Sequence, residues 1–294
     1  MPAIINRTLA ETAMPRVLAI SSQVVRGHIG LSAVVPALQA FGNEVWPMPT
    51  VLLSNHPGHE RFAATRIAPG DLRAMLDALD DSGWLGEIDA VLTGYLPTRE
   101  HVAFAAEVVA RVSSRRDQPV IYLCDPVLGD DPKGLYVAPE AAASIRDLLL
   151  PRAHILTPNR FELAWLSGMP VAGPEDAVVA ARRLRDGSNI SHLLATSVPA
   201  DGARLFNVLL RDEGVQPLAF SVEQAPIAPH GTGDLLSGLV LGRCLGGERP
   251  YDAIARALAG VAQAIADSVG RDELDLGLIG EWHPRHDRVS VVWL

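Results

Sequence analysis

The clearest pattern in the sequence is PHGTGDLLSG at residues 229–238, where Gly231 and Gly233 flank Thr232 immediately before an apolar helical stretch. Glycines allow successive backbone N–H groups to converge on one point. The start of a helix adds unpaired N–H groups and a partial positive charge. The pattern therefore predicts an anion-binding turn at the start of a helix, with the carboxylate of Asp234 in the first helical turn.

Such a turn suits a phosphoryl group in transfer, because this chemistry needs charge stabilisation and a positioned nucleophile rather than covalent help from the protein. Asp234 can then accept the proton of an attacking hydroxyl as a general base. A plainer interpretation is a helix that merely begins with glycine and carries an aspartate in its first turn. The four residues Gly231–Asp234 do not by themselves decide between the two.

Short β-rich runs alternate with helical stretches on either side of this turn, which favours an α/β fold with a mostly parallel sheet. Two runs near the end, 206–211 and 218–222, have no helix between them and predict an antiparallel hairpin at the sheet edge. The other expected strands are 17–21, 44–49, 90–93, 120–124, 155–156 and 192–195. The expected helices are 27–41, 69–81, 98–115 (capped by Thr98), 139–149, 158–166, 174–185, 234–245 and 250–269.

Composition limits the class of protein. The chain has 294 residues, of which 48% are hydrophobic, and this length can bury a large core without disulfides. A net charge of −9 argues against binding to nucleic acid. We expect Cys124 and Cys244 to be reduced core residues. Lys133 is the only lysine, and no Walker-type phosphate loop is present.

The first residues lack the apolar run of a secretory signal, so we expect 1–15 to be a disordered extension, or Met14 to be the true start. Residues 16–294 are then a single domain. The sequence has no run of about 18 apolar residues, the length of a membrane-spanning helix. We therefore expect a cytoplasmic protein that contacts neither membranes nor nucleic acid.

Polar side chains follow two other predicted strands. Asp125 comes directly after 120–124, and Asn159 and Glu162 lie three residues apart on one helix face after 155–156. Asp125 and Glu162 can hold Mg²⁺ directly or through water, since this ion prefers oxygen ligands. The alternatives are a solvated turn at Asp125 and a capped surface helix at Glu162. Asp130 and Asp131 are each expected to be surface-loop residues, and one of the two can face the phosphates.

The amino-terminal half offers weaker signals. Ser22 stands at the carboxyl end of the first strand, and Gly27 and Gly30 behind it permit a close backbone approach, although their spacing is not that of a dinucleotide fingerprint. The polar run Ser54–Gly58 reads alone as an ordinary turn. Tyr95 can stack on a flat substrate, yet a tyrosine in this context is more often a core residue.

Together these segments resemble pyridoxal kinase, of the ribokinase superfamily, from Arg16 to about Gly270. The resemblance implies a ribokinase-like three-layer α/β/α sandwich, ATP-dependent phosphorylation of the 5′-hydroxymethyl group of pyridoxal, pyridoxine or pyridoxamine, Mg²⁺, often a monovalent cation such as K⁺, and usually a homodimer. The matching segments are Ser22–Gly30, Val45–Pro47, Thr50, Ser54–His56, Gly94–Leu96, Cys124–Gly129, Val137–Pro139, Pro158–Glu162 and Gly231–Asp234.

The resemblance also implies roles for individual residues. Asp234 matches the catalytic base, and Gly231, Thr232 and Gly233 match its anion hole. The implied vitamer-binding positions are Ser22, Thr50, His56, Pro57, Gly58, Tyr95 and Asp234. The implied ATP-binding positions are Asp125, Asp130, Thr157, Asn159, Glu162, Thr196, Ala219, Phe220, Ser221, Val222, Gly231 and Gly233.

Two departures from the family concern the vitamer side. Gln23 stands where many members have histidine, and Pro57 stands where the family commonly has threonine beside the substrate. Proline removes a hydrogen-bond donor and fixes φ, so the lid over the substrate can differ in shape. The vitamer preference is therefore left open by the sequence.

Two competing hypotheses remain. One is a kinase for another hydroxymethylated heterocycle, such as hydroxymethylpyrimidine, against which Ser22, Ser54–His56 and Tyr95 speak. The other is a non-catalytic vitamin B6 binding protein. A protein of that kind has no chemical need for Asp234.

Overall fold

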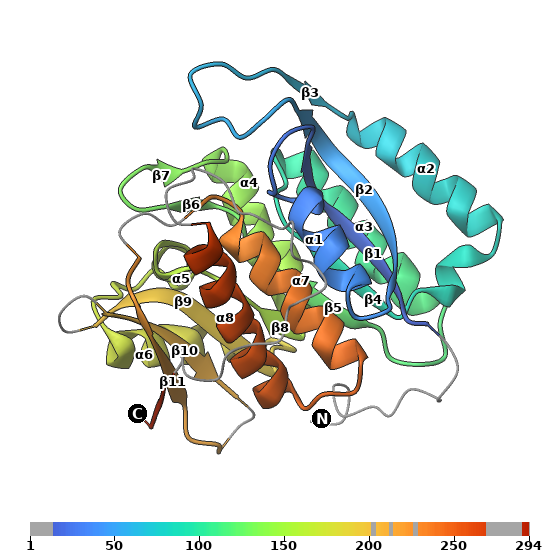
Figure 1. Cartoon of the computed structure of the whole chain (residues 1–294). Coiled ribbons are helices and arrows are strands. Elements are labelled where there is room, and N and C mark those ends of the chain that lie inside the picture. Colours follow the sequence, from blue (N-terminus) through green and yellow to red (C-terminus); the bar gives the residue numbers. More distant parts are fainter. Residues whose placement is uncertain (1–13, 201–203, 212–213, 226–228, 269–289, 294) are drawn as a thin grey trace.

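A computed structural model describes residues 14–200, 204–211, 214–225, 229–268 and 290–293 (Figure 1). Its main sheet runs in the order β12-β11-β10-β9-β8-β5-β4-β1-β2-β3. These strands are β1 Arg16–Val24, β2 Glu44–Leu53, β3 Ala64–Arg66, β4 Ala90–Thr93, β5 Ile121–Cys124, β8 Ile155–Leu156, β9 His192–Pro199, β10 Arg204–Leu210, β11 Leu218–Glu223 and β12 Ser290–Trp293.

The centre of the sheet is parallel and its two edges are antiparallel. Strands β2, β1, β4, β5, β8 and β9 pair in parallel. Strand β3 pairs antiparallel with β2, and β10, β11 and β12 continue antiparallel from β9. The predicted fold class is confirmed, including the hairpin at 206–211 and 218–222. Parallel neighbours require long crossovers, and helices supply them here.

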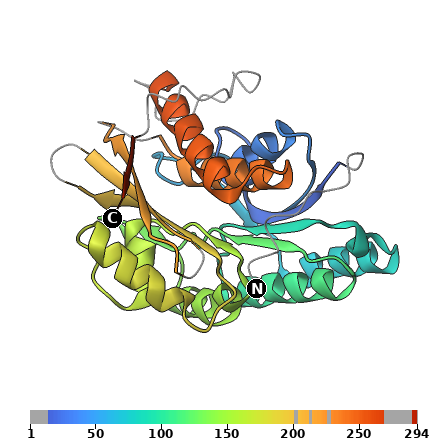
Figure 2. The ribbon, with the colours of Figure 1, turned by 90° about the horizontal axis from the view of Figure 1, so that it is seen from below.

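Helices cover both faces of the sheet (Figures 1 and 2). One face carries α1 (Leu31–Gln39), α7 (Thr232–Leu245) and α8 (Pro250–Asp267). The other carries α2 (Pro69–Asp81), α3 (Arg99–Ser114), α4 (Pro139–Ser144), α5 (Arg160–Ser167) and α6 (Pro174–Arg185). This arrangement makes the three layers that the resemblance implied.

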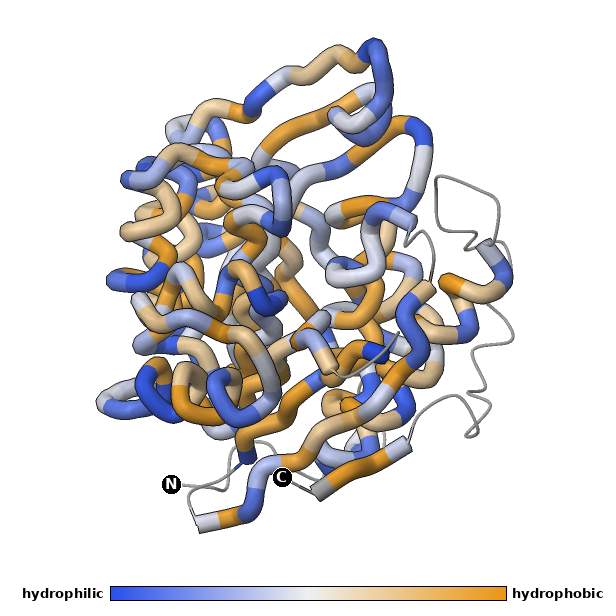
Figure 3. Tube along the Cα trace, turned by 90° about the vertical axis from the view of Figure 1, so that its left-hand side faces the viewer, coloured by the Kyte–Doolittle hydropathy of each residue, from blue (hydrophilic) through white to orange (hydrophobic). Residues whose placement is uncertain are grey.

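Strand β1 shows how the sequence produces two cores. Leu18 and Ile20 belong to the hydrophobic cluster on one face, whereas Val17 and Ala19 belong to the cluster on the other. This alternation follows from the two-residue period of a strand. The strands inside the molecule are largely apolar, and the outer turns are mostly polar (Figure 3).

Several boundaries differ from the predictions for local reasons. Helix α1 begins at Leu31 instead of residue 27. Gly30 has φ 55°, which is not a helical value, and it forms an antiparallel bridge with Gln23 of β1. Strand β2 continues past Pro49 to Leu53, and a register shift opposite Ser21 and Ser22 accommodates the proline. The stretch 139–149 divides into α4 and a π-helical turn, Ile145–Leu149.

The two-residue strand β8 was predicted, but several other short elements were missed. These are β3, β12, the hairpin of β6 (Gly129–Asp130) with β7 (Gly134–Leu135), and the 3₁₀ turns Trp84–Glu87 and Leu150–Arg152. Thr98 does occupy the N-cap of α3. Its hydroxyl, however, bonds Glu100 and His101 instead of the backbone.

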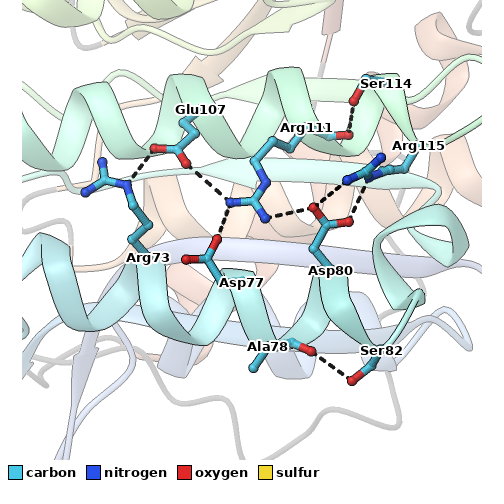
Figure 4. A network of polar contacts seen from close by, with 9 residues as sticks. All are labelled: Arg73, Asp77, Ala78, Asp80, Ser82, Glu107, Arg111, Ser114 and Arg115. Carbon is cyan, nitrogen blue, oxygen red and sulfur yellow. Dashed lines mark hydrogen bonds and ion pairs between the residues drawn. The ribbon is translucent and has the colours of Figure 1, made fainter.

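An ion-pair network joins the outer surfaces of α2 and α3 (Figure 4). Arg111 of α3 contacts Asp77 and Asp80 of α2 at 2.6 and 2.8 Å, and Arg115 also contacts Asp80, at 2.7 Å. Arg73 reaches back from α2 to Glu107 at 2.9 Å. These contacts fix the pairing of the two helices away from the carboxyl edge of the sheet.

Both cysteines are free and buried, as expected. Among the helices in the described ranges, none is long and apolar enough to cross a membrane. Residues 1–13 lie outside those ranges, so the extension expected over 1–15 stays a prediction, as does the single domain over 16–294.

Candidate active site

The predicted polar residues gather where the parallel strands end. Ser22 lies near the carboxyl end of β1, Gly94 follows β4, and Asp125 follows β5. Thr157 follows β8, and the first turn of α7 carries Asp234. In sheets of this kind the carboxyl ends of the strands are where ligands bind. The topology thus brings residues that are far apart in sequence to one edge.

The turn at Gly231 has the form that the sequence predicted. Gly231 has φ 94°, and a Cβ there would lie 1.9 Å from the carbonyl oxygen of His28. Gly30 is equally constrained, since a Cβ would lie 2.1 Å from the Ser22 carbonyl oxygen. The turn after β1 therefore packs directly on the start of α7, and only glycine fits at either position.

Asp234 lies in this contact. The backbone N–H of Gly30 donates a hydrogen bond to its carboxylate, and a Cβ on Gly94 would lie 3.9 Å from Oδ1. Burial raises the pKa of Asp234 to about 6, against the lowering effect of the Gly30 hydrogen bond. A carboxylate with a pKa of this size is ionised at neutral pH and is a better proton acceptor than an ordinary aspartate.

Asp125 lies on the other side of Gly233. Its Oδ2 accepts the Ser237 hydroxyl at 2.7 Å and would lie 3.9 Å from a Cβ placed on Gly233. Burial, and then the charge of Asp234, raise the pKa of Asp125 to about 7. The two buried carboxylates repel each other, and a cation bound between them would reduce this repulsion.

Glu162 has a structural duty that the sequence hypothesis only partly anticipated. Asn159 caps α5 and accepts the Glu162 N–H at 2.9 Å, while Glu162 Oε2 accepts the Asn159 N–H at 2.8 Å. Its Oε1 accepts the Leu128 N–H at 2.9 Å. The helix is capped as the plainer interpretation held, but Glu162 is buried, not on the surface. Burial, followed by the charge of Asp125, raises its pKa well above the usual range.

The hairpin β6–β7 is attached to this cap. The Asn159 side chain donates to the Gly129 carbonyl oxygen at 2.8 Å. The hairpin carries Asp130, whose pKa is raised by burial, and the exposed Lys133. Thr196 pairs with Asn159 in a parallel bridge, its N–H donating to the Pro158 carbonyl oxygen at 2.9 Å. These residues form one side of the site.

Residues near the ends of β1, β2 and β4 form the other side. The Thr50 hydroxyl donates to the Tyr95 carbonyl oxygen at 2.9 Å, and the Tyr95 N–H donates to Ser21 Oγ at 3.0 Å. The loop after β2 is closed by the Ala63 N–H, which donates to Ser54 Oγ at 2.8 Å. His56 in this loop stacks on His230, with ring centroids 3.6 Å apart.

The stretch Ala219–Val222 lies within β11, on the antiparallel side of the sheet. Ala219 and Phe220 are fully buried in the two cores, and Ser221 Oγ accepts the Arg204 Nε–H at 2.7 Å. Their expected role near the nucleotide stays a prediction.

Sequence reasoning missed two residues, Ser237 and His230. Both stand in the quoted stretch 229–238, but their partners Asp125 and His56 are distant in sequence. Only the folded arrangement reveals them.

Comparisons with known proteins identify the family of the chain. The family model described as phosphomethylpyrimidine kinase matches residues 37–277. A pyridoxal kinase, PdxY, of Pseudomonas putida is 34% identical over 267 residues, covering 90% of this chain and 92% of its own. That of Deinococcus radiodurans is 36% identical over 239 residues, covering 79% of this chain and 80% of its own. The chain belongs to the pyridoxal kinase family.

Solved structures of pyridoxal kinases share the fold. The enzyme of Leishmania donovani in complex with ADP and pyridoxamine has a TM-score of 0.87 at 27% identity, covering 95% of this chain and 99% of that one. The pyridoxal kinase of Entamoeba histolytica has a TM-score of 0.88 at 24% identity, covering 96% and 100%.

Proposed function

We propose that this pyridoxal kinase family member transfers the γ-phosphoryl group of ATP to the 5′-hydroxymethyl group of pyridoxal, and of pyridoxine or pyridoxamine, for vitamin B6 salvage to pyridoxal 5′-phosphate. The observation that carries the proposal is Asp234 beside the Gly231–Gly233 turn. A base with a pKa of about 6 lies there in the first turn of α7, and the first N–H groups of this helix have no side-chain cap.

The chemistry follows from these residues. Asp234 takes the proton of the hydroxymethyl group as the oxygen attacks the γ-phosphorus. The bond between that phosphorus and the oxygen bridging to the β-phosphate breaks, and ADP leaves with that oxygen. The N–H groups of the Gly231–Gly233 turn stabilise the charge that develops on the phosphoryl oxygens.

The site also fits Mg²⁺. Asp125 offers a carboxylate beside Asp234, and a cation would offset their repulsion. Within the described residues no group of three or more His, Cys, Asp or Glu side chains is placed to hold a metal, so the remaining ligands would be nucleotide oxygens and water. Glu162 would act through water, because both of its oxygens already accept backbone N–H groups. When bound, Mg²⁺ supplies charge neutralisation of the phosphates.

We assign ligands to the two sides of the site. The vitamer contacts Ser22, Thr50, His56, Pro57, Gly58 and Tyr95. The nucleotide contacts Asp125, Asp130, Thr157, Asn159, Glu162, Thr196, the main chain of 219–222 and the Gly231–Gly233 turn. We also propose a homodimer, a K⁺ ion and a cytoplasmic location for this chain, as the resemblance to pyridoxal kinase implies.

A second candidate substrate is hydroxymethylpyrimidine, which the phosphomethylpyrimidine kinase family model favours. The curated relatives and the ligands of the Leishmania donovani structure favour the vitamin B6 reading.

The test is release of ADP from ATP–Mg²⁺ with pyridoxal, pyridoxine, pyridoxamine or hydroxymethylpyrimidine as acceptor. We expect turnover with at least pyridoxal. Turnover with hydroxymethylpyrimidine alone would identify the second candidate. Binding of pyridoxal without turnover of any acceptor would leave a vitamin B6 binding protein.

A further inference from the structure

The two sides of the site meet in a pair of histidine rings. His56, in the loop after β2, stacks on His230, which directly precedes Gly231. The ring centroids are 3.6 Å apart and the ring planes are inclined by 18°. This is a close, nearly parallel contact between two segments separated by more than half the chain.

Gly58 completes the contact. Its N–H donates to His56 Nδ1 at 3.0 Å. A Cβ on Gly58 would lie 2.8 Å from His56 Nδ1 and 3.4 Å from His230 Nε2. The backbone of residue 58 therefore lies against both rings, and a larger residue would have to displace one of them.

The rings are held in a form that can stack. His56 Nδ1 accepts a hydrogen bond, so the proton of the neutral ring is on Nε2. Burial first, and then the positive charges of His230, Lys133 and His59, lower the pKa of His56 to about 4. At neutral pH His56 is uncharged, and the repulsion that two imidazolium rings would suffer at this distance is absent.

The position of the pair gives it a consequence for catalysis. His230 is bonded to the first residue of the anion turn, and His56 belongs to the loop on the vitamer side. A displacement of about 1 Å between a nucleophile and its acceptor can cost about 10²-fold in rate. A contact that joins these two loops therefore sets the distance between the hydroxymethyl group and the phosphoryl group.

We propose that His230 is a positioning residue, whose ring, stacked on His56, fixes the vitamer loop 54–58 against the anion turn. This inference rests on the proposed function. It adds to it a residue that acts through His56 and Gly231 without touching the reacting atoms. The pair is only partly buried, so its main effect is on the geometry of the site and not on the stability of the core.

The test compares His230→Ala with His230→Phe in the full-length protein. Loss of the ring in His230→Ala is expected to raise KM for pyridoxal about 3- to 10-fold, the fold-change that corresponds to one aromatic pair, and to lower kcat. KM for ATP and the thermal unfolding midpoint should stay as in the wild type. His230→Phe keeps a flat ring and should restore KM for pyridoxal.

A second pair of variants approaches the same contact from the backbone. Gly58→Ala forces a methyl group against both rings and should reproduce the rise in KM for pyridoxal. Gly70→Ala is its matched control, because a Cβ on Gly70 meets nothing within 4 Å. It should leave both KM values unchanged.

The proposal is overturned if His230→Ala leaves KM for pyridoxal unchanged, if both KM values and the unfolding midpoint change together, or if His230→Phe fails to rescue. The NMR shifts of the His56 ring protons test the stack without turnover, since they should move when the His230 ring is removed. Unchanged shifts would also overturn the inference. Absence of turnover in the wild type would overturn the proposed function alone.

Discussion

Asp234 is held between two opposing influences, burial that raises its pKa to about 6 and the Gly30 N–H that lowers it. Because only the ionised form can accept a proton, kcat/KM for pyridoxal should rise with pH through about 6 and then level off. Asp234→Asn should lower kcat by about 10²- to 10⁴-fold, the usual scale for a general base. Initial rates of ADP release at pH values roughly 1–2 units around that pKa measure the pH dependence of kcat/KM and the kcat of the variant. Near-normal kcat in the variant would remove Asp234 from its assigned role.

For Asp125 the protonated form, and not the ionised form, favours folding. Its folded pKa, about 7, lies above that of the unfolded chain, so the folded protein binds the extra proton. The resulting stabilisation is complete below the unfolded pKa and is lost as pH rises through about 7. Asp125→Asn should therefore stabilise the ligand-free protein at pH 8 by about 1–2 kcal/mol, where one pKa unit is worth about 1.4 kcal/mol, and should weaken Mg²⁺–ATP binding.

Urea denaturation of the ligand-free protein at several pH values measures this effect. Asp81→Asn, at an exposed position, is the control and should change neither the urea midpoint nor its dependence on pH. The raised pKa of Asp234 also makes the free energy of unfolding fall as pH rises. Asp125→Asn should therefore reduce this pH dependence without removing it. A variant that is destabilised at pH 8 would show that the Ser237 hydrogen bond outweighs the burial of charge.

Individual residues could be read from the sequence where local chemistry was sufficient. Asp234 and Asp125 were identified because each follows a recognisable local signal, a glycine turn or the end of an apolar strand. The sequence predicted only part of the role of Glu162, because one of its hydrogen bonds is accepted from the N–H of Leu128 in another loop. His230 had no local signal, because its partner lies in the loop after β2.

At the scale of elements, α5 depends on its capping box. In Glu162→Gln the amide NH₂ cannot accept a hydrogen bond, so either the Leu128 or the Asn159 N–H loses its partner. A buried donor left unpaired costs about 1–3 kcal/mol, and we expect this loss in the absence of nucleotide and metal. Chemical denaturation measures it, with exposed Glu140→Gln as the control. Unchanged stability of the ligand-free protein would instead favour a role in metal binding only.

The pairing of α2 with α3 depends on Arg111, which contacts Asp77, Asp80 and Glu107. Networks of partly exposed ion pairs contribute little each, so Arg111→Met should lower stability by about 1 kcal/mol at low salt. The difference should shrink in about 1 M salt, where screening is strong. Denaturation at both salt concentrations tests this, and Arg249→Met, which removes a single exposed pair with Asp252, is the control. A loss that is independent of salt would point to packing of the arginine stem.

Elements with a clear apolar pattern or clear boundaries were predicted well, including the two-residue strand β8, whereas short strands without such a signal were missed. The bounds of α2, α6 and β4 agree with the sequence prediction because each combines an apolar pattern with clear boundaries. Strand β3 and the hairpin β6–β7 have two or three residues per strand. Such strands are fixed by the partner they pair with, and the partner is a property of the fold.

For the whole molecule, the alternation of strands and helices was enough to predict the layers. The order of the strands was not accessible from local pattern, because β1 takes a place between β2 and β4 that depends on how the crossovers pass over the sheet. That order determines which strand ends become neighbours. It explains why residues of the site could be named from the sequence before their mutual contacts could be.

Strand β12 has a consequence for handling the protein. Residues 290–293 pair antiparallel with Leu218–Ser221 and cover the outer side of β11. If the outer edge of β11 were not paired, its free backbone N–H and C=O groups could pair with another molecule and so promote aggregation. Truncation before residue 290 would expose that edge, whereas a purification tag joined beyond residue 294 would leave the cover in place.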